Sequence, residues 1–387
     1  MAQRALRVIY VVNARLPGGG VGNVAYQQAL GVQQHGYLHR LIASSLRDQS
    51  FAGSPASTLG LPGRIFKRLA LYDPTGRVYP LEDAVFDQFA ARHVTDCDVL
   101  HGWHGQSFRA KRKARQRGAI TMMQSGSTHP LTQAQLLTEE HRRWGFDYHY
   151  PMPRHGLDEI AEADYVIIPA EFARDTFIEH GTPADRVFCL PFGVDIGRFK
   201  VHPAERPPDV FRVIFVGQVS IRKGIPYLLE AWRKLCWSEA ELLIIGRADP
   251  VTRQWLRSYT IPDGIHWLTH SPELWKWYHT SDVFVFPSIE EGSALVTYEA
   301  MACGLPIITT YNAGSVVRDG QDGLLVPIRD IDALCERLQQ VRDDAALREQ
   351  LGRSARARIE GFTWQAHQQR LIDIYHQVVA AKNSGTL

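Results

Sequence analysis

The chain has 387 residues, more than one ordinary domain, and this length favours two domains. Apolar residues make up 45% and charged residues 22% of the chain, which excludes the disordered, collagen-like and coiled-coil classes. A count of 43 Lys and Arg against 41 Asp and Glu is too even for a protein that binds nucleic acid across a whole face. We therefore expect a globular protein without a nucleic-acid partner.

The first strand-like run is too short for a signal segment or a membrane-spanning helix, because Asn13 and Arg15 interrupt it. No later stretch is long and apolar enough to span a bilayer. The cysteines are five, an odd number with no metal-type spacing, at Cys97, Cys189, Cys236, Cys303 and Cys335. They fit reduced thiols better than a disulfide framework. We expect a cytoplasmic protein with no metal site.

Short β-branched runs alternate with amphipathic helical stretches along the whole chain, which is typical of parallel sheets with crossover helices. In the first half, buried strands are expected at 7–12, 38–44, 98–102, 119–124, 164–169 and 186–191. In the second half, they are expected at 211–217, 241–246, 265–268, 282–287, 305–310 and 323–327. The pattern predicts an α/β protein with two doubly wound, Rossmann-like sheets.

The segment 200–210 is rich in proline and has no apolar periodicity, so it is the expected linker. We predict a first domain over 1–205 and a second over 206–365. A final helix over 366–387, with apolar positions at helical spacing, is expected to pack back on the first domain. The Ser-, Gly- and Pro-rich stretch 46–63 is expected to be a surface excursion without a strand.

The most informative stretch follows the strand at 282–287, where Glu291 and Glu299 are separated by seven residues. If a helix opens around Ser293 to Leu295, the two carboxylates lie on the order of 10 Å apart. The backbone N–H groups of Gly292, Ser293, Ala294 and Leu295 lie between them and form an anion site. A nucleotide sugar fits this layout, with a hydroxylated group at each end and a diphosphate in the middle.

A second anchor follows the strand at 211–217, where Gly217 and Gln218 lead into a short loop with Arg222 and Lys223. Pro226 in the first turn marks the start of a helix here. Two cations beside a helix start would neutralise the diphosphate as it leaves, without a metal ion.

These elements together resemble the retaining, nucleotide-sugar-dependent glycosyltransferases of family 4, which have the two-domain GT-B fold with a cleft between the domains. The resemblance rests on the loop with Lys223, on EGSALVTYEAMACGLP from Glu291, on 167–199 and on the closing helix. It implies that Glu291 contacts the transferred sugar, that Glu299 binds the ribose hydroxyls and that Lys223 binds the diphosphate. Gln218 departs from the family's usual Arg, so either Arg222 substitutes for that Arg or donor binding is weakened.

Three consecutive glycines, Gly18, Gly19 and Gly20, follow the first strand. Residues without a side chain let the backbone come close to a bound group. The dinucleotide fingerprint is absent, because Asn23 stands where its third Gly belongs, so a nicotinamide enzyme is disfavoured. Similarity to related transferases implies that Gly19 and Gly20 face the donor phosphate and the acceptor.

Three histidines follow strands of the first half, where loops line the expected cleft. A histidine there could bond a sugar hydroxyl or assist proton movement from the acceptor. The string GSTH resembles a subgroup of the family, so His129 is ranked first, His104 second and His101 third. The first two are the candidate catalytic histidines.

The run 108–118 carries six cations on an expected helix. It predicts either a solvated helix face or peripheral contact with an anionic membrane at its inner face, where a lipid-linked acceptor would lie. The function expected overall is transfer of a sugar from a nucleoside diphosphate sugar to a carbohydrate, lipid-linked or small acceptor, with no cofactor. A nucleotide-sugar epimerase and a non-catalytic sugar-nucleotide-binding protein remain the alternatives.

Overall fold

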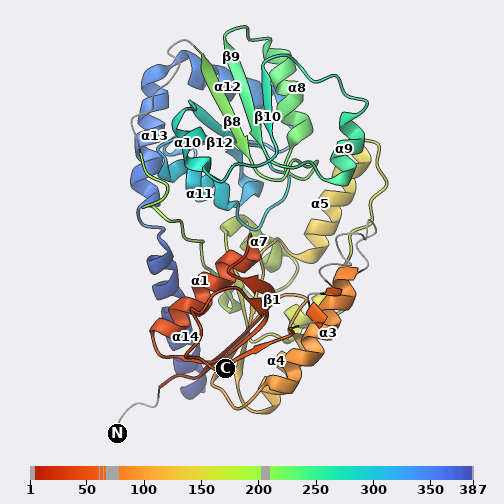
Figure 1. Ribbon diagram of the computed structural model, residues 1–387, viewed down its shortest axis with the longest axis vertical. Coiled ribbons are helices and arrows are strands. Elements are labelled where there is room, and N and C mark those ends of the chain that lie inside the picture. Colours follow the sequence, from red (N-terminus) through yellow and green to blue (C-terminus); the bar gives the residue numbers. More distant parts are fainter. Residues whose placement is uncertain (1–4, 61, 64, 67–77, 202–209, 386–387) are drawn as a thin grey trace.

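The computed structural model describes residues 5–60, 62–63, 65–66, 78–201 and 210–385. Its two sheets lie one above the other along the long axis of the molecule (Figure 1). The expected boundary near residue 205 lies outside the described residues.

The first sheet has seven strands in the order β3-β2-β1-β4-β5-β6-β7, and every neighbouring pair is parallel. Its central strands are buried on both faces because helices cover each side, which explains their continuous aliphatic runs. The strands are β1 (Val8–Leu16), β2 (Leu38–Leu46), β3 (Ala56–Thr58), β4 (Val99–Trp103), β5 (Ile120–Gln124), β6 (Tyr165–Ile168) and β7 (Val187–Cys189).

The short edge strand β3 corrects the expectation of a strand-free excursion over 46–63. Ala56 and Thr58 pair in parallel with Leu41 and Ala43 of β2. The strand is polar and largely exposed, so it carries no hydrophobic pattern by which it could be recognised in the sequence.

The second sheet has six parallel strands in the order β10-β9-β8-β11-β12-β13. This topology confirms the prediction of two doubly wound sheets. The strands are β8 (Phe211–Val216), β9 (Ala240–Ile245), β10 (Ile265–Leu268), β11 (Val283–Phe286), β12 (Ile307–Thr310) and β13 (Gly323–Val326).

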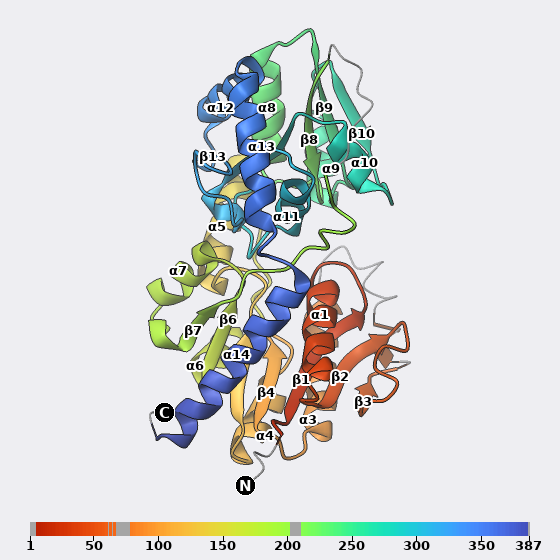
Figure 2. The same cartoon turned by 90° about the vertical axis from the view of Figure 1, so that its left-hand side faces the viewer.

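Helices connect successive strands and cover the faces of both sheets (Figures 1 and 2). In the first half these are α1 (Val21–Gln34), α3 (Val78–His93), α4 (Phe108–Gln116), α5 (Pro130–Arg143), α6 (Gly156–Glu162), α7 (Glu171–Glu179) and the 3-10 turn η1 (Ala184–Arg186). In the second half they are α8 (Ile225–Leu235), α9 (Pro250–Leu256), α10 (Leu274–His279), α11 (Leu295–Ala302), η2 (Tyr311–Ala313), α12 (Ile331–Asp343), α13 (Ala345–Ile359) and α14 (Trp364–Asn383).

The last helix, α14, returns to the first sheet and lies beside α1, as predicted (Figure 2). A Cβ atom at Gly31 would lie 2.5 Å from Gln368 Cγ, so glycine permits the close approach of the two helices. His367 of α14 contacts Gln28 of α1 through Nε2, at 3.1 Å, and Pro191 O through Nδ1. These buried polar contacts give the docking a defined register. Within the described ranges, none of the helices is both long enough and apolar enough to cross a bilayer.

Candidate functional site

The predicted donor residues lie at strand ends where each sheet reverses its order. In the second sheet the order reverses between β8 and β11, and the segments 217–224 and 287–294 follow these two strands. In the first sheet it reverses between β1 and β4, and the glycines at 18–20 follow β1. Ligands of open α/β sheets bind in the crevice at such points. The topology therefore brings the candidates of each half to the ligand-binding edge of its sheet.

The loops of the two halves pack backbone against backbone. A Cβ atom at Gly292, in the loop after β11, would lie 2.0 Å from the carbonyl oxygen of Gly126, in the loop after β5. A Cβ atom at Gly126 would in turn lie 3.8 Å from Cγ2 of Val21, which follows the triple glycine. Gly292 is therefore required for packing of the two halves, in addition to any contact with a ligand.

Lys223 and Glu291, two of the predicted catalytic residues, form a direct ion pair between Nζ and Oε1. Gly224 allows Lys223 and Glu291 to come into contact. Its φ of 72° is in the left-handed region, and a Cβ atom there would lie 1.9 Å from the carbonyl oxygen of Pro287. The loop after β8 is thereby pressed against the end of β11. Arg222 lies beside the pair, with its Nη2 3.5 Å from Glu291 Oε1.

This pair is largely withdrawn from solvent, since Lys223 and Glu291 are each 8% exposed. Burial, with Arg222 as a neighbouring cation, holds the pKa of Lys223 well below its ordinary value. A diphosphate placed here would supply the negative charge that keeps the ammonium protonated, and it would free Glu291 for another partner. The arrangement is suited to an anion that arrives together with hydroxyl groups.

Glu290 is a functional candidate that the sequence reasoning missed. Its side chain is fully buried, and Oε1 accepts hydrogen bonds from the backbone N–H and the hydroxyl of Thr128, at 3.2 and 2.8 Å. Oε2 accepts from Gln133 Nε2 at 2.9 Å and from Arg222 Nη1 at 3.1 Å. Burial alone would raise the pKa of Glu290, but Arg222 and these hydrogen bonds outweigh it and lower the pKa. The Glu290 carboxylate thus connects Arg222, which lies beside the Lys223–Glu291 pair, to Thr128 and Gln133 of the first half of the molecule.

Glu299 lies within α11 and accepts a hydrogen bond from the hydroxyl of Tyr278 at 3.2 Å. Burial raises the pKa of Glu299 to about 7, and the Tyr278 bond and the Arg198 charge offset part of this rise. The carboxyl group is therefore near its titration midpoint at neutral pH. It can act as acceptor for hydroxyl hydrogens in its ionised form.

The start of α11 lies between the two acidic positions. Leu295 is its first residue, and Ala294 caps it without a side-chain bond. The N–H of Ala294, expected in the anion site, donates to Ala313 O at 3.1 Å, and that of Thr297 donates to Ala294 O at 3.0 Å. Among the described residues this leaves the N–H groups of Leu295 and Val296 without a backbone partner in the first turn. Ser293 uses its hydroxyl to donate to the carbonyl of Gly314 at 2.8 Å. The serine hydroxyl is thus engaged in the structure, whereas the backbone N–H groups of Leu295 and Val296 can receive an anion.

The remaining donor candidates lie on the same loops. Gly217 follows β8 with a φ of 148°, and Gln218 after it is exposed. Gly19 and Gly20 are exposed ahead of α1, and Gly20 has a φ of 51°. In the described part of the chain no three His, Cys, Asp or Glu side chains gather as a metal site.

Two protein-family models match the chain. The model described as Glycosyltransferase Family 4 matches residues 18–198, and the model described as Glycosyl transferases group 1 matches residues 210–344. The chain belongs to the family 4 glycosyltransferases. This membership confirms the resemblance expected from the sequence.

Curated relatives of this chain carry the name D-inositol 3-phosphate glycosyltransferase. The protein from Paenarthrobacter aurescens is 30% identical over 233 residues, which cover 55% of this chain and 56% of that protein. The protein from Thermomonospora curvata is 27% identical over 343 residues, which cover 80% of this chain and 78% of that protein. The chain spans about half the length of the first relatives that it matches, at 56% and 54%.

Solved structures show the same fold. Sucrose-phosphate synthase from Thermosynechococcus elongatus has a TM-score of 0.71 at 20% identity and covers 98% of this chain and 100% of its own. Anabaena HepE, solved in complex with UDP-glucose, has a TM-score of 0.68 at 15% identity and covers 96% of this chain and 100% of its own.

The candidate histidines are held by contacts within the first half of the chain. His129 caps α5, where its Nδ1 accepts from the Leu131 N–H at 3.3 Å, and its ring stacks on His180. Burial lowers the pKa of His129 to about 4. The Nε2 atom of His104 lies 3.1 Å from Gly156 O, and burial lowers its pKa as well. Both rings are neutral at pH 7, and their catalytic roles remain predictions.

His101 is a structural residue in this fold. Its ring is fully buried, and its Nδ1 lies 2.7 Å from the hydroxyl of Tyr375 in α14. Burial lowers the pKa of His101 to about 3. The hydrogen bond between His101 and Tyr375 therefore helps to hold α14 on the first half of the molecule.

The basic helix α4 is matched by acidic neighbours. Arg112 pairs with Glu162, Arg115 with Asp164 and Arg117 with Asp96. Lys111 is buried and pairs with Glu159 at 2.7 Å. The run of cations is therefore compensated by neighbouring carboxylates, as expected for a solvated helix face.

Proposed function

We propose that this chain is a retaining glycosyltransferase that transfers a sugar from a nucleoside diphosphate sugar to a carbohydrate or other hydroxylated small acceptor. The observation that carries the proposal is the buried Lys223–Glu291 pair beside Arg222 at the start of α11, with Glu299 further along that helix. Family membership supports the reaction class, and HepE, a neighbour in fold, is solved with UDP-glucose.

The donor diphosphate is assigned to the space between Lys223, Arg222 and the first turn of α11. A phosphate group there replaces Glu291 as the partner of Lys223, since both are anionic oxygen ligands of the ammonium. Glu291 can then accept a hydroxyl of the transferred sugar, and Glu299 can accept the ribose hydroxyls. The backbone N–H groups of Leu295 and Val296 add the partial positive charge of the helix start.

In the proposed reaction the bond between the anomeric carbon and the diphosphate oxygen breaks as negative charge develops on the leaving group. Lys223, Arg222 and the start of α11 stabilise that charge, so no metal ion is required in the proposal. The acceptor hydroxyl attacks the anomeric carbon from the face on which the diphosphate leaves, and its proton passes to the leaving phosphate oxygen. The new glycosidic bond then has the configuration of the donor.

The acceptor and the cellular location are further parts of the proposal. The curated relatives are named for D-inositol 3-phosphate, which makes phosphorylated and free cyclitols the first acceptors to test. The paired cations of α4 do not favour a lipid-linked acceptor at an anionic membrane. The five cysteines are free thiols, which supports a reducing, cytoplasmic location.

The test measures binding of UDP-glucose, UDP-N-acetylglucosamine and GDP-mannose by calorimetry, and their turnover by mass spectrometry. We expect Lys223→Met to lower turnover about 100- to 1,000-fold, the loss typical of one removed charge-stabilising group. The matched control is Lys234→Met, on the same helix-loop unit, where the lysine is exposed and pairs with Asp332. Unchanged turnover in both Lys223→Met and Glu291→Gln contradicts the assignment.

The same assay separates the alternatives. An epimerase converts the donor to an isomeric nucleotide sugar without an acceptor. Donor binding without turnover identifies a sugar-nucleotide-binding protein, for which exposed Gln218 in place of the usual Arg is the motivating feature. Proton NMR of the fresh product tests retention, and an anomeric configuration opposite to that of the donor contradicts it.

A further inference from the structure

The irregular segment 144–155 connects α5 to α6 in the first half of the molecule. The ring of Tyr148 stacks on His141 of α5, with 4.1 Å between the ring centroids. Two residues later Tyr150 is half-buried, and its hydroxyl donates to Gln133 Oε1 of α5 at 2.5 Å. Both tyrosines therefore hold the segment against α5.

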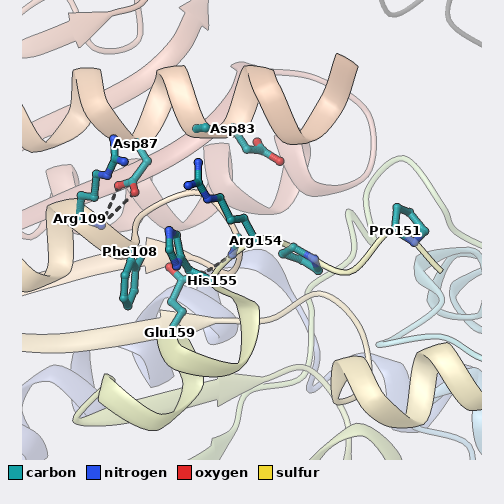
Figure 3. Close-up of a pocket in the computed structure, with 11 residues that line it drawn as sticks. Asp83, Asp87, Phe108, Arg109, Pro151, Arg154, His155 and Glu159 are labelled. Atoms are coloured by element: carbon teal, nitrogen blue, oxygen red, sulfur yellow. Dashed lines mark hydrogen bonds between the residues drawn. The ribbon is translucent and has the colours of Figure 1, made fainter. Parts of the chain in front are cut away.

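The far end of the segment lines a pocket of about 310 Å³ in the first half (Figure 3). Pro151, Arg154 and His155 lie along this pocket, and the ring of His155 stacks on Phe108 at the start of α4, with 4.6 Å between the centroids. Tyr150 thus lies between two stacked aromatic pairs. These pairs limit the positions that its hydroxyl can take.

Gln133 connects Tyr150 to Glu290 in the second half of the molecule. The glutamine side chain is buried, and its Nε2 donates to Glu290 Oε2 at 2.9 Å. An ionised carboxylate only accepts hydrogen bonds, so the amide nitrogen must face Glu290 and the amide oxygen must face Tyr150. Burial raises the pKa of Tyr150 and the charge of Glu290 adds to the rise, so the hydroxyl remains a donor at neutral pH. Tyr150 therefore stabilises the amide orientation that supports Glu290.

Glu290 in turn fixes the direction of Arg222. The oxygen that accepts from Gln133, Oε2, also accepts from Arg222 Nη1 at 3.1 Å. The guanidinium is planar and its donors form a fixed fork, so a bond at Nη1 also sets the direction of Nε and Nη2. Nη2 lies 3.5 Å from Glu291 Oε1, on the side of the Lys223–Glu291 pair. The bond to Glu290 thus turns the remaining donors of Arg222 toward the donor site.

The two oxygens of Glu290 have separate partners among the described residues. Oε1 accepts both bonds from Thr128, whereas Oε2 is shared by Gln133 and Arg222. When an anion draws Arg222 away, Oε2 keeps the donor from Gln133. This lowers the cost of leaving a buried carboxylate short of donors.

We propose that Gln133 and Tyr150 are positioning residues of the donor site, which act through Glu290 to direct the guanidinium of Arg222 toward the donor diphosphate. The first half of the molecule thereby contributes to donor affinity through side chains that do not contact the donor. This inference rests on the donor site proposed above, and its test distinguishes the two.

The test is a double-mutant cycle on donor affinity, measured by calorimetry on the full chain with UDP-glucose, UDP-N-acetylglucosamine and GDP-mannose. Gln133→Met removes both amide contacts at similar size, and we expect it to weaken donor binding about tenfold. Tyr150→Phe removes only the hydroxyl, and we expect a loss of about three- to fivefold, the effect of one neutral hydrogen bond. In an Arg222→Met background neither change should weaken binding by more than about twofold.

Each variant has a matched control with the same substitution outside the cluster. Gln135 is exposed on the same helix and donates to Glu139 Oε1 at 3.0 Å, and the hydroxyl of Tyr37 lies 3.3 Å from His376 Nε2. Gln135→Met and Tyr37→Phe are expected to keep the donor affinity. Misfolded protein lowers the number of binding sites in the titration but leaves the affinity of the folded remainder unchanged, so the measurement distinguishes a purely structural defect from loss of positioning.

The outcomes separate this inference from the proposed donor site. Wild-type affinity in both single variants, or the same fold-loss with and without Arg222, overturns the positioning role alone. A wild type that binds none of these nucleotide sugars contradicts the donor site, and the positioning role with it. If Gln133→Met fails to fold, the cycle with Tyr150→Phe decides, because that change lies in an irregular segment and removes a single oxygen atom.

Discussion

Glu290 offers a decisive perturbation, because one buried carboxylate holds groups from both halves of the molecule. Glu290→Gln preserves the size of the side chain and leaves one oxygen to accept from Thr128. The new amide nitrogen, however, faces two donors, Gln133 Nε2 and Arg222 Nη1, which lie within 2.9 and 3.1 Å of Oε2. Gln133 then loses this acceptor, and Arg222 keeps only its longer contacts with the carbonyl oxygen of Glu290 and with Glu291 Oε1, at 3.5 Å each.

The magnitude follows from these contacts. Loss of one partner of a buried ion pair costs about 3–5 kcal/mol. Arg222 has 28% of its side chain exposed, so water recovers part of its solvation and we expect a loss of about 2–3 kcal/mol in the free energy of unfolding. Arg222 also loses the anchor that directs it to the diphosphate. Donor affinity is therefore expected to fall about tenfold, which corresponds to about 1.4 kcal/mol.

Urea unfolding followed by fluorescence measures the stability, and calorimetry with UDP-glucose, UDP-N-acetylglucosamine and GDP-mannose measures the affinity. The matched control is Glu336→Gln on α12, an exposed carboxylate whose change is expected to stay within about 0.5 kcal/mol. Combining Glu290→Gln with Arg222→Met tests the pair, since the double variant should cost clearly less than the two single losses together. Additivity within about 0.5 kcal/mol, or wild-type stability of Glu290→Gln, refutes the reasoning.

Three further predictions concern a titration, a close contact and a strained backbone. The pKa of Glu299 is raised to about 7, so its carboxylate forms as the pH rises through neutrality. We therefore expect the donor affinity measured by calorimetry to increase from pH 6 to pH 8. Glu299→Gln should remove that pH dependence. Because the unfolded carboxyl ionises first, the contribution of Glu299 to stability is expected to fall as pH rises toward 7. Gly292→Ala places Cβ 2.0 Å from a carbonyl oxygen of the other half and should lower the unfolding midpoint clearly, whereas Gly53→Ala, with open space around it, should not. Arg329 has a φ of 67°, so Arg329→Gly should be about 1 kcal/mol more stable than Arg329→Ala, although both lose the guanidinium.

Much of the fold follows from the sequence because parallel strands buried on both faces need continuous aliphatic runs. The runs at 211–217 and 282–287 coincide closely with β8 and β11. The edge strand β3 is short, polar and largely exposed, so it has no such run and the sequence pattern does not predict it. Apolar pattern thus predicts the centre of each sheet better than its edges.

The candidate site was predictable in part. The chemistry of a diphosphate and the family resemblance predict Lys223 and Glu291 as site residues, and the structure places them in contact. Glu290 was missed because its partners are Thr128 and Gln133, 162 and 157 residues away in the chain. Adjacent glutamates look equivalent in a sequence, and only the packing of α5 against the loop after β11 distinguishes them.

The same packing connects the binding of the donor to the relation between the two halves. Glu140 of α5 is buried and accepts from the hydroxyl of Tyr227 in α8 and from Arg329 Nε, at 2.6 and 2.7 Å. Together with the bonds of Glu290, this holds α5 against α8 and the loops of the second half (Figure 1). A displacement of the halves that separates α5 from the second half must break these carboxylate contacts together. Arg222 belongs both to the proposed donor site and to the hydrogen-bonded cluster around Glu290. A diphosphate that attracts Arg222 therefore competes with Glu290 for the same guanidinium group, and so weakens a contact that joins the two halves.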